Sequence, residues 1–379
     1  MIVITTHAVF LDGRDIYGPP HAISVYLNKH KQSHIFIKHS LYLNYPYSLV
    51  EHYENGRLKN QTSIRIKSSI YLLRLLEEQY ISFQTIRKIG GSQLLIIATN
   101  PVNHLCAMAL KWFHIAKKSI YFSADFAISR FENPLMNRAY HWIDTLAQNN
   151  AQSVWSISKR IVAYRKRHGL AKKKNILVPN APFFHDIKRA HHDMIRRHDL
   201  VVVSALEPGV AFEMLIQVVG ELKKVIPDIR LILIGSGSKE KALKKSVIDQ
   251  GLGKHIIFKG SLSHTEMFRV TTKCGIGIAF YDVADPNHFR YFSDPMKVRD
   301  YLASGLPVIV SGNSAIGEEL VTHSAGRVVA INEGELRRTI KHMLLNKKAY
   351  EAMRKNAINL AEATDAEKTL SKLLTQNTI

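Results

Sequence analysis

Short apolar runs alternate with longer amphipathic segments throughout the chain. The apolar runs are rich in β-branched residues, which suits buried strands, whereas the amphipathic segments repeat apolar residues every three or four positions, as helices do. In the first half we expect strands at 2–6, 34–38, 93–98, 119–123, 153–157 and 175–178. We expect helices there at 21–29, 70–80, 102–115, 134–148 and 159–168. Residues 42–59 show no such period and are predicted to form a loop, followed by a candidate strand at 63–67.

The second half repeats this alternation. Its predicted strands are 200–204, 230–234, 255–259, 276–280, 306–310 and 326–330. Its predicted helices are 211–224, 239–249, 265–272, one beginning at 295, 315–322, and those from 334 to the end. Alternation of this kind predicts parallel sheets with helices on both faces. The expected fold class is therefore α/β, with two Rossmann-like doubly wound domains facing a cleft, and ligands bind beyond the carboxyl ends of such strands.

A chain of 379 residues is too long for one ordinary core, so two domains are expected. We predict a first domain at 1–183, a polar, His-rich linker at 184–198, and a second domain at 199–355. A helix at 356–379 is predicted to pack back on the first domain. The N-terminus lacks a basic leader, and no apolar run approaches the length of a membrane span. A soluble or peripheral cytoplasmic protein is expected.

The stretch Asp294–Ser311 predicts a loop, a short helix and a buried strand. Pro295 suits the first turn of the helix, and Gly305 lies just past its last apolar position, where a C-cap is expected. A helix N-terminus presents unbonded N–H groups and a partial positive charge, to which Lys297 and Arg299 add. This combination favours a phosphate site. A surface helix with solvated charges is the alternative.

The net charge of +21 is unevenly distributed. Residues 1–190 carry 26 basic and 10 acidic side chains, or +16, and residues 191–379 carry 26 and 21, or +5. The densest basic segment comprises Lys159, Arg160, Arg165, Lys166, Arg167, Lys172, Lys173 and Lys174. It predicts a patch for a polyanionic partner such as an anionic membrane surface, a nucleic acid or an anionic substrate. A merely solvated basic face is the alternative.

The segment Pro295-Met-Lys-Val-Arg-Asp-Tyr-Leu-Ala-Ser-Gly-Leu-Pro-Val-Ile-Val resembles the donor-site segment of GT-B glycosyltransferases. These include the retaining family 4 group and lipid-acceptor enzymes such as the xanthan glucuronosyltransferase. The order of the surrounding elements, from 200–204 through 256–260, is also similar to the C-terminal nucleotide-sugar domain of this family. Residues 121–125 and 153–158 carry a weaker likeness in the first half.

This resemblance implies a nucleotide-sugar donor site on the second domain. Lys297 would neutralise the donor diphosphate at the helix N-terminus. Met296 would contact the nucleotide, and Asp300 would bind ribose or sugar hydroxyls, although the helix dipole alone could also favour an acid there. The donor-binding set so implied is Ser204, Gly235, Gly237, His264, Tyr281, Asp294, Met296, Lys297 and Asp300.

Two members of this set have plain alternatives. Gly235-Ser-Gly237 follows a strand and permits close approach of the backbone to a nucleotide, but a simple turn would use the same glycines. His264 lies where the family reads the base, and it could equally cap the next helix.

The sequence departs from the family pattern at two places. Retaining members carry a Glu eight residues before the second acid, and this chain has Phe292 there. They also carry Arg and Lys after the first strand of the second domain, where the segment 204–209 has no cation. Asp294, Arg290 or Arg299 are candidates to compensate. These departures leave a retaining or an inverting outcome open.

In the first domain, Asp125 ends a predicted strand and is a candidate general base for an acceptor hydroxyl, with an N-cap as the alternative. Gly18, at the start of a helix, matches the glycine-bearing acceptor or phosphate loop of the family. His21 and His7 are alternatives for acid–base chemistry. Asp282-Val-Ala-Asp285 has the wrong spacing for the metal signature of GT-A enzymes, so no catalytic metal or cofactor is expected.

The predicted function is metal-independent transfer of a hexosyl group from a UDP- or GDP-sugar to a lipid-linked or cell-surface glycan in polysaccharide biosynthesis. The basic first half would hold the protein peripherally on the cytoplasmic face of the inner membrane. A catalytically inactive GT-B scaffold remains an alternative, as does a nucleic-acid-binding protein, although no recognition-helix signature supports nucleic acid. A dinucleotide-dependent oxidoreductase is disfavoured because Gly-x-Gly-x-x-Gly does not follow the first strand.

Overall fold

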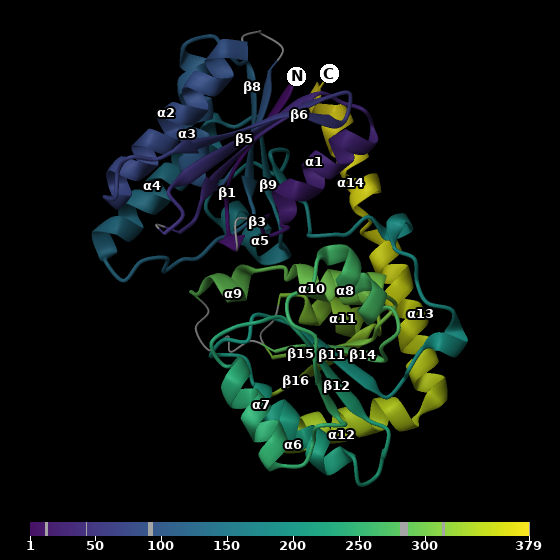
Figure 1. Ribbon diagram of the computed structural model, residues 1–379. Coiled ribbons are helices and arrows are strands. Elements are labelled where there is room, and N and C mark those ends of the chain that lie inside the picture. Colours follow the sequence, from purple (N-terminus) through teal and green to yellow (C-terminus); the bar gives the residue numbers. More distant parts are fainter. Residues whose placement is uncertain (12–13, 43, 90–93, 281–286, 313–314, 379) are drawn as a thin grey trace. The chain divides into compact units, whose positions relative to one another are not determined.

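The computed structural model describes residues 1–11, 14–42, 44–89, 94–280, 287–312 and 315–378. They form two compact units, each built on its own sheet (Figure 1). Unit 1 comprises Met1–Pro179 with Glu367–Ile379, and unit 2 comprises Asn180–Ala366. The predicted α/β class with two Rossmann-like domains is therefore confirmed.

Unit 1 contains an eight-stranded sheet in the order β10-β9-β8-β7-β1-β4-β5-β6. Its strands are β1 (Ile2–Ala8), β4 (His34–Ser40), β5 (Tyr47–Glu54), β6 (Arg57–Arg65), β7 (Leu95–Thr99), β8 (Lys118–Ser123), β9 (Ser153–Ser156) and β10 (Asn175–Leu177). Neighbouring strands from β10 to β4 are parallel, as predicted. The short strands β2 (Phe10–Leu11) and β3 (Arg14–Asp15) pair separately.

The prediction of a loop at 42–59 is wrong. Strands β5 and β6 form an antiparallel hairpin at this edge of the sheet, with a turn at Asn55-Gly56 in which both residues have positive φ angles. Asn-Gly is the favoured pair for such a turn. The hairpin lacked an apolar signal because β6 is polar and almost wholly exposed. The sheet of unit 1 is consequently mixed rather than purely parallel.

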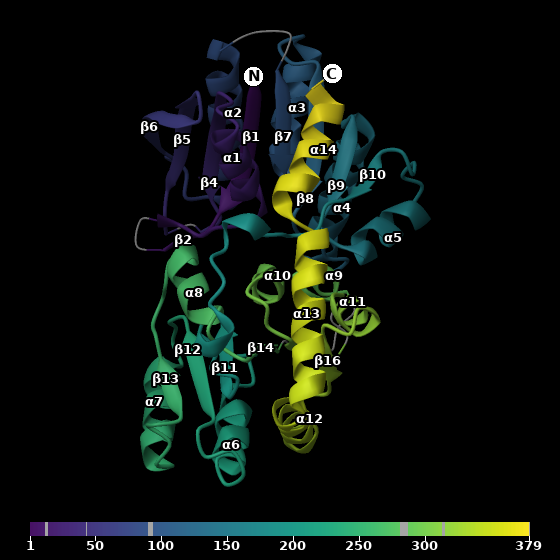
Figure 2. The same cartoon turned by 90° about the vertical axis from the view of Figure 1, so that its right-hand side faces the viewer.

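Helices cover both faces of this sheet. They are α1 (Pro19–Lys29), α2 (Tyr71–Ile89), α3 (Pro101–Trp112), α4 (Pro134–Asn150), α5 (Lys159–Arg167) and α14 (Ala366–Thr378). Helices α2, α3 and α4 pack in succession on one face, and α1 and α14 lie on the other (Figures 1 and 2). The α2 and α3 face is closed by apolar side chains such as Val3, Ile86 and Leu110.

Unit 2 contains a six-stranded, wholly parallel sheet in the order β13-β12-β11-β14-β15-β16. Its strands are β11 (Asp199–Val203), β12 (Arg230–Ile234), β13 (Ile256–Phe258), β14 (Ile276–Ala279), β15 (Val308–Ser311) and β16 (Gly326–Val329). Its α-helices are α6 (Phe212–Leu222), α7 (Glu240–Asp249), α8 (His264–Thr271), α9 (Phe289–Phe292), α10 (Met296–Ala303), α11 (Gly317–Thr322), α12 (Glu333–Leu345) and α13 (Lys347–Ala363). One face packs on α6, α7 and α12, and the other on α8, α10, α11 and α13.

The chain divides differently from the predicted boundaries. Residues 184–198, predicted as a linker, belong to unit 2, where Phe184 and Ile187 are buried in the core and the Phe184 N–H donates to Asp365 at 2.9 Å. They form two short 3₁₀ turns, Phe184–Asp186 and His192–Met194, rather than an exposed tether. Only α14 of the C-terminal helices lies in unit 1, and α13 packs on α10 within unit 2.

Candidate functional site

One tyrosine bridges the two central strands of the unit 2 sheet. The order of the strands reverses between β11 and β14, which pair through Leu200 and Val201. Beyond that point the Tyr301 hydroxyl accepts from the Val203 N–H at 2.6 Å and donates to the Ile278 carbonyl at 3.4 Å. Its ring lies over Gly277, where a Cβ would approach it to 2.5 Å. A ligand crevice is expected at such a reversal, beyond the carboxyl ends of the strands.

Helix α10 begins at this carboxyl edge. The chain turns out of the helix at Gly305, whose φ of 82° is the left-handed conformation expected for a C-terminal glycine. The N-terminal turn of α10 presents its N–H groups and carries Lys297, which is half-buried. The predicted helix is therefore present with Lys297 in its first turn, and the anion site at its terminus stays a prediction.

Arg290 is a second cation close to Lys297. Burial, followed by the nearby charge of Arg290, lowers the pKa of Lys297 to about 8. Arg290, from α9, also reaches the loop that follows β11, since its Nη1 would lie 3.5 Å from a Cβ placed on Gly209. Like charges are kept together most readily where an anion binds between them. Arg290 therefore lies close both to Lys297 and to the segment 204–209, and its role as a compensating cation stays a prediction.

The loops after β11 and β12 are packed backbone against backbone. A Cβ on Gly235 would lie 2.0 Å from the Ser204 carbonyl oxygen, and Gly235 has a φ of 136°. A Cβ on Gly237 would lie 2.5 Å from the Leu206 carbonyl oxygen. The backbone N–H of Ser238 donates to Glu207 at 2.8 Å. The two glycines are therefore required by this close approach, whatever ligand the loops hold.

His264 and Asp300, predicted separately, are brought together. The His264 Nε2 lies 3.1 Å from Asp300 Oδ1, which places the imidazole over a buried carboxylate on α10. Burial raises the pKa of Asp300, and the contact with His264 opposes that rise. His264 is the first residue of α8, but the cap of that helix is made by Ser263 and Glu266, so capping does not account for His264.

Asp294, predicted to bind the donor, has a structural position. Its carboxylate is buried and accepts from Arg299 Nε at 3.1 and 3.2 Å and from the Asn180 N–H at 2.8 Å. Arg299 also pairs bidentately with Glu319 on α11, at 2.8 and 3.1 Å. These contacts fix the start of α10 to the segment at Asn180 and to α11. Neither Asp294 nor Arg299 therefore points toward a ligand.

Phe292 stands where the retaining pattern has a Glu, and it is buried. Met296 begins α10 and is half-buried. Tyr281, also predicted to bind the donor, lies outside the described residues.

In unit 1, Asp125 follows β8 and its side chain is 43% exposed. Its Oδ2 accepts from Arg130 Nη1 at 2.7 Å. The carboxylate is thus accessible at the carboxyl edge of the sheet, as a base for an acceptor would need to be, and Arg130 fixes its orientation.

The histidines predicted for acid–base chemistry are held internally. His21 Nδ1 accepts from the Gly18 N–H at 3.0 Å, so its Nε2 donates to Asp15 at 2.6 Å. His7 contacts Glu78 at 2.9 Å through Nε2 and Asn100 at 2.9 Å through Nδ1. Both ring nitrogens of each histidine are therefore engaged, and Gly18 and His21 together cap α1.

Arg165 does not belong to the predicted basic patch. Arg165 is 1% exposed, and it pairs with Asp144 at 3.1 Å and donates to Ser123 at 3.0 Å beneath α5. Lys174 is half-buried and donates to the Asn149 carbonyl at the end of α4 at 3.0 Å. The side chains of Lys159, Lys166, Arg167, Lys172 and Lys173 are exposed, and Arg160 is partly so. The prediction for Arg165 is wrong because a buried arginine in a basic helix has the same sequence context as an exposed one.

Within the described ranges, no group of three or more His, Cys, Asp or Glu side chains could hold a metal ion. Nor does any helix described for this chain have the length and apolar character needed to cross a membrane. A cavity of about 870 Å³ opens at the amino edge of the unit 2 sheet, near Asp199, Arg230 and His255. That edge is opposite to the predicted donor residues.

The family described as "Glycosyl transferases group 1" matches residues 187–360, which make up most of unit 2. No curated protein matches the chain in sequence. Sucrose-phosphate synthase from Thermosynechococcus elongatus is similar in structure, with a TM-score of 0.71 at 14% identity over 99% of this chain and 97% of that chain.

Two further solved structures cover the whole architecture. HepE from Anabaena, in complex with UDP, has a TM-score of 0.71 at 13% identity over 99% of this chain and 100% of that chain. A glycosyltransferase from Rickettsia africae has a TM-score of 0.68 at 12% identity, with 99% and 97% covered. At these identities the likeness shows the fold, and the GT-B architecture predicted from the sequence is confirmed. The subgroup stays a prediction.

Proposed function

We propose that this chain, a glycosyltransferase with the GT-B fold, moves a sugar from a nucleotide-diphosphate sugar to a lipid-linked or cell-surface glycan. The donor would be a UDP- or GDP-sugar bound at the carboxyl edge of the unit 2 sheet. The acceptor would be reached on the cytoplasmic face of the inner membrane. No metal is assigned to the reaction.

One observation carries the donor site. Lys297 and Arg290 converge at the N-terminus of α10, beside the loop that ends at Gly209. Two cations and a helix N-terminus together offer charge and directed N–H groups to a diphosphate. The leaving group of the reaction is a nucleoside diphosphate, so the same groups would stabilise the charge that develops as the glycosidic bond breaks.

The pair of His264 and Asp300 supports a neighbouring role for the nucleoside. A buried carboxylate next to an imidazole supplies an acceptor and a donor of hydrogen bonds in one place. Ribose hydroxyls are suited to such a pair. We assign Asp300 to these hydroxyls and His264 to holding the carboxylate in position while contacting the nucleotide.

The acceptor side of the proposal rests on unit 1. Asp125 is accessible at the carboxyl edge of β8 and would take the proton of the acceptor hydroxyl as it attacks the anomeric carbon. The exposed lysines and arginines of α5 and of the segment after it would attract an anionic membrane, to which each contributes about 1 kcal/mol. A lipid-linked acceptor would lie at that surface.

A thermal-shift panel of UDP-, GDP-, ADP- and dTDP-sugars tests the donor site. We expect one nucleotide class to raise the melting temperature of the wild type. Lys297→Ala and Arg290→Ala should each reduce that rise, because each removes one diphosphate cation. Lys341→Ala, at an exposed position on α12, is the matched control and should leave it unchanged. If no nucleotide sugar shifts the wild type, the proposed donor site is refuted.

A further inference from the structure

The first three turns of α2 expose apolar side chains and bury charged ones. Large apolar side chains face solvent there, and Leu72, Leu76 and Tyr80 are each more than 60% exposed. Leu73 is exposed as well; it lies next to Leu72, three residues before Leu76 and seven before Tyr80, so the four side chains share one side of the helix. Ile70 and Tyr71 extend the apolar group at its N-terminal end. We call these six residues the α2 apolar surface.

The opposite side of the same turns buries charges. Arg74 Nε donates to Glu78 at 3.0 Å, and Arg74 Nη2 donates to the Ser40 and Tyr45 carbonyls at 3.1 Å each. Glu78 also contacts His7. Since the fold here is held by these ionic contacts, the exposed leucines do not serve the core of unit 1. A contiguous exposed apolar surface of this kind marks a binding surface, whereas scattered apolar residues do not.

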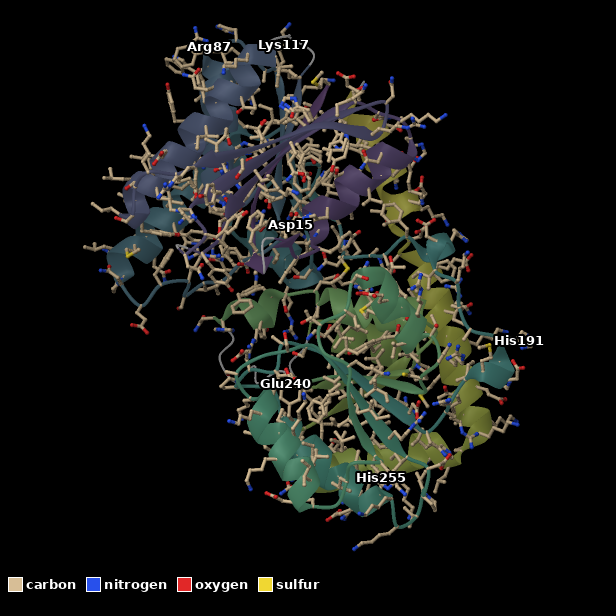
Figure 3. All side chains as sticks on the ribbon, in the orientation of Figure 1. Asp15, Arg87, Lys117, His191, Glu240 and His255 are labelled. Carbon is tan, nitrogen blue, oxygen red and sulfur yellow. The ribbon has the colours of Figure 1, made fainter. Side chains whose placement is uncertain are left out.

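Exposed cations lie at both ends of this surface. Arg65 and Lys67 precede α2, and Arg87 and Lys88 follow on its last turn, all four exposed. Figure 3 labels Arg87, on the last turn of α2, and Lys117, just before β8, and both side chains are exposed. Glu77 lies on α2 between these two groups of cations, and its carboxylate accepts from the Lys67 and Ser68 N–H groups at 2.9 to 3.1 Å. Its charge is thus held against the backbone at the start of the helix.

Helix α4 also exposes large apolar side chains next to a cation. Leu135 and Trp142, seven residues apart on one side of the helix, are both exposed, and Arg138 between them is exposed too. Helix α3 packs between α2 and α4, and all three lie on the same face of the sheet (Figure 1). Tryptophan and arginine beside leucine are side chains suited to the boundary between lipid headgroups and acyl chains.

We propose that the α2 apolar surface, with the exposed side of α4, inserts into the interfacial layer of an anionic bilayer. Apolar side chains flanked by cations match acyl chains flanked by anionic headgroups. A second copy of the chain is a poorer occupant, because residues 1–190 carry a charge of +16 and two such surfaces would repel. The inference rests on the proposed function only in the identity of the lipid-linked acceptor. It assigns insertion into the bilayer to α2 and α4, whereas the cations of α5 and of the segment after it would attract the anionic surface without inserting.

Flotation with vesicles of phosphatidylcholine, with and without phosphatidylglycerol, tests this. The triple variant Leu72→Ser, Leu73→Ser, Leu76→Ser should bind the anionic vesicles at least about tenfold more weakly, because three apolar side chains no longer enter the lipid. The control is Val225→Ser, Ile248→Ser, Val321→Ser, which removes three exposed apolar side chains from unit 2. It should bind as the wild type does. Wild-type affinity in the α2 variant would overturn the proposal.

Insertion itself can be observed through Trp142. The chain has three tryptophans, of which Trp155 is buried, so Trp112→Phe leaves Trp142 as the exposed reporter. Its emission should shift to shorter wavelength on anionic vesicles and be quenched by brominated acyl chains. An unchanged spectrum with bound vesicles would overturn the role of α4.

Sedimentation without lipid addresses the competing occupant. A dimer of the wild type that the leucine variant abolishes would overturn the bilayer proposal in favour of a second copy. The nucleotide-sugar thermal shift should be the same in wild type and both triple variants. A wild type that floats but shows no nucleotide shift would refute the donor site and leave the membrane surface standing.

Discussion

Replacing Arg299 by Met should destabilise unit 2 strongly. Arg299 is 5% exposed and makes four contacts within 3.2 Å, two with Asp294 and two with Glu319. The variant leaves Asp294 buried, with the Asn180 N–H as a remaining donor to its carboxylate. Removing one partner of a buried pair costs about 3–5 kcal/mol, because the other charge stays in a poorly solvated site.

The loss should depend on pH in a defined direction. Burial already raises the pKa of Asp294, and Arg299 opposes that rise. Without Arg299 the folded-state pKa rises further above the unfolded value, so the folded state binds a proton more readily. Its stability then falls as pH increases from the unfolded pKa toward the folded one. The deficit of the variant should therefore be largest near neutral pH and smaller near pH 5.

Urea unfolding can report the two units separately. Trp112, Trp142 and Trp155 all lie in unit 1, so tryptophan fluorescence follows that unit, whereas far-ultraviolet circular dichroism follows both. The variant should lower the dichroism transition assigned to unit 2 and leave the fluorescence transition in place. Asp294→Asn combined with Arg299→Met should recover part of the loss, because no buried charge is then stranded.

The matched control is Arg337→Met. Arg337 pairs with Glu221 in the same unit, but both side chains are nearly half exposed. Such surface pairs contribute about 0–1 kcal/mol. The reasoning is refuted if Arg299→Met costs no more than this control.

Three further variants bear on the site. The affinity for a diphosphate should fall as pH rises through about 8, because Lys297 loses its proton there. Lys297→Arg should flatten this dependence in titrations of UDP or GDP between pH 7 and 9. A steep fall in the Lys297→Arg variant would contradict this role of Lys297. Gly235→Ala should weaken nucleotide binding several-fold and destabilise unit 2, because its Cβ would meet the Ser204 carbonyl. Gly251→Ala, whose Cβ would lie in open space, should cost only about 1–2 kcal/mol of backbone strain. Equal melting temperatures of the two variants would count against the packing argument. Asp125→Asn should lower kcat by about 10²-fold or more with the nucleotide thermal shift unchanged, and near-wild-type turnover would remove Asp125 as the base.

The sequence pattern succeeded where local chemistry and burial agree. The segment from Pro295 to Val310 has helical spacing, a C-terminal glycine and a β-branched run, and each feature independently favours the structure found. The alternation of the parallel strands was predictable for the same reason, since buried strands consist of apolar residues.

The rest depended on contacts that no local pattern encodes. The polar strand β6 gave no apolar signal, although Asn55-Gly56 marked the turn before it. Asp294 and Arg299 are five residues apart and resemble surface charges, but their burial is decided by Glu319 and Asn180, which lie far away in the chain. The position of Arg290 could not be predicted either, because the short helix α9 brings it beside Lys297 and Gly209, which is far away in the sequence.

The assignment of α14 to unit 1 has a consequence for biosynthesis. Leu370, Leu373 and Leu374 of α14 are buried, and Glu367 contacts Lys29 and His30 at the end of α1. During translation the strands of unit 1 emerge first, but the helix that covers α1 emerges only after all of unit 2. Unit 2 is thus the first to have its whole sequence available on the ribosome. The nascent unit 1 would therefore keep one face of its sheet incompletely covered until α14 has been synthesised and docks.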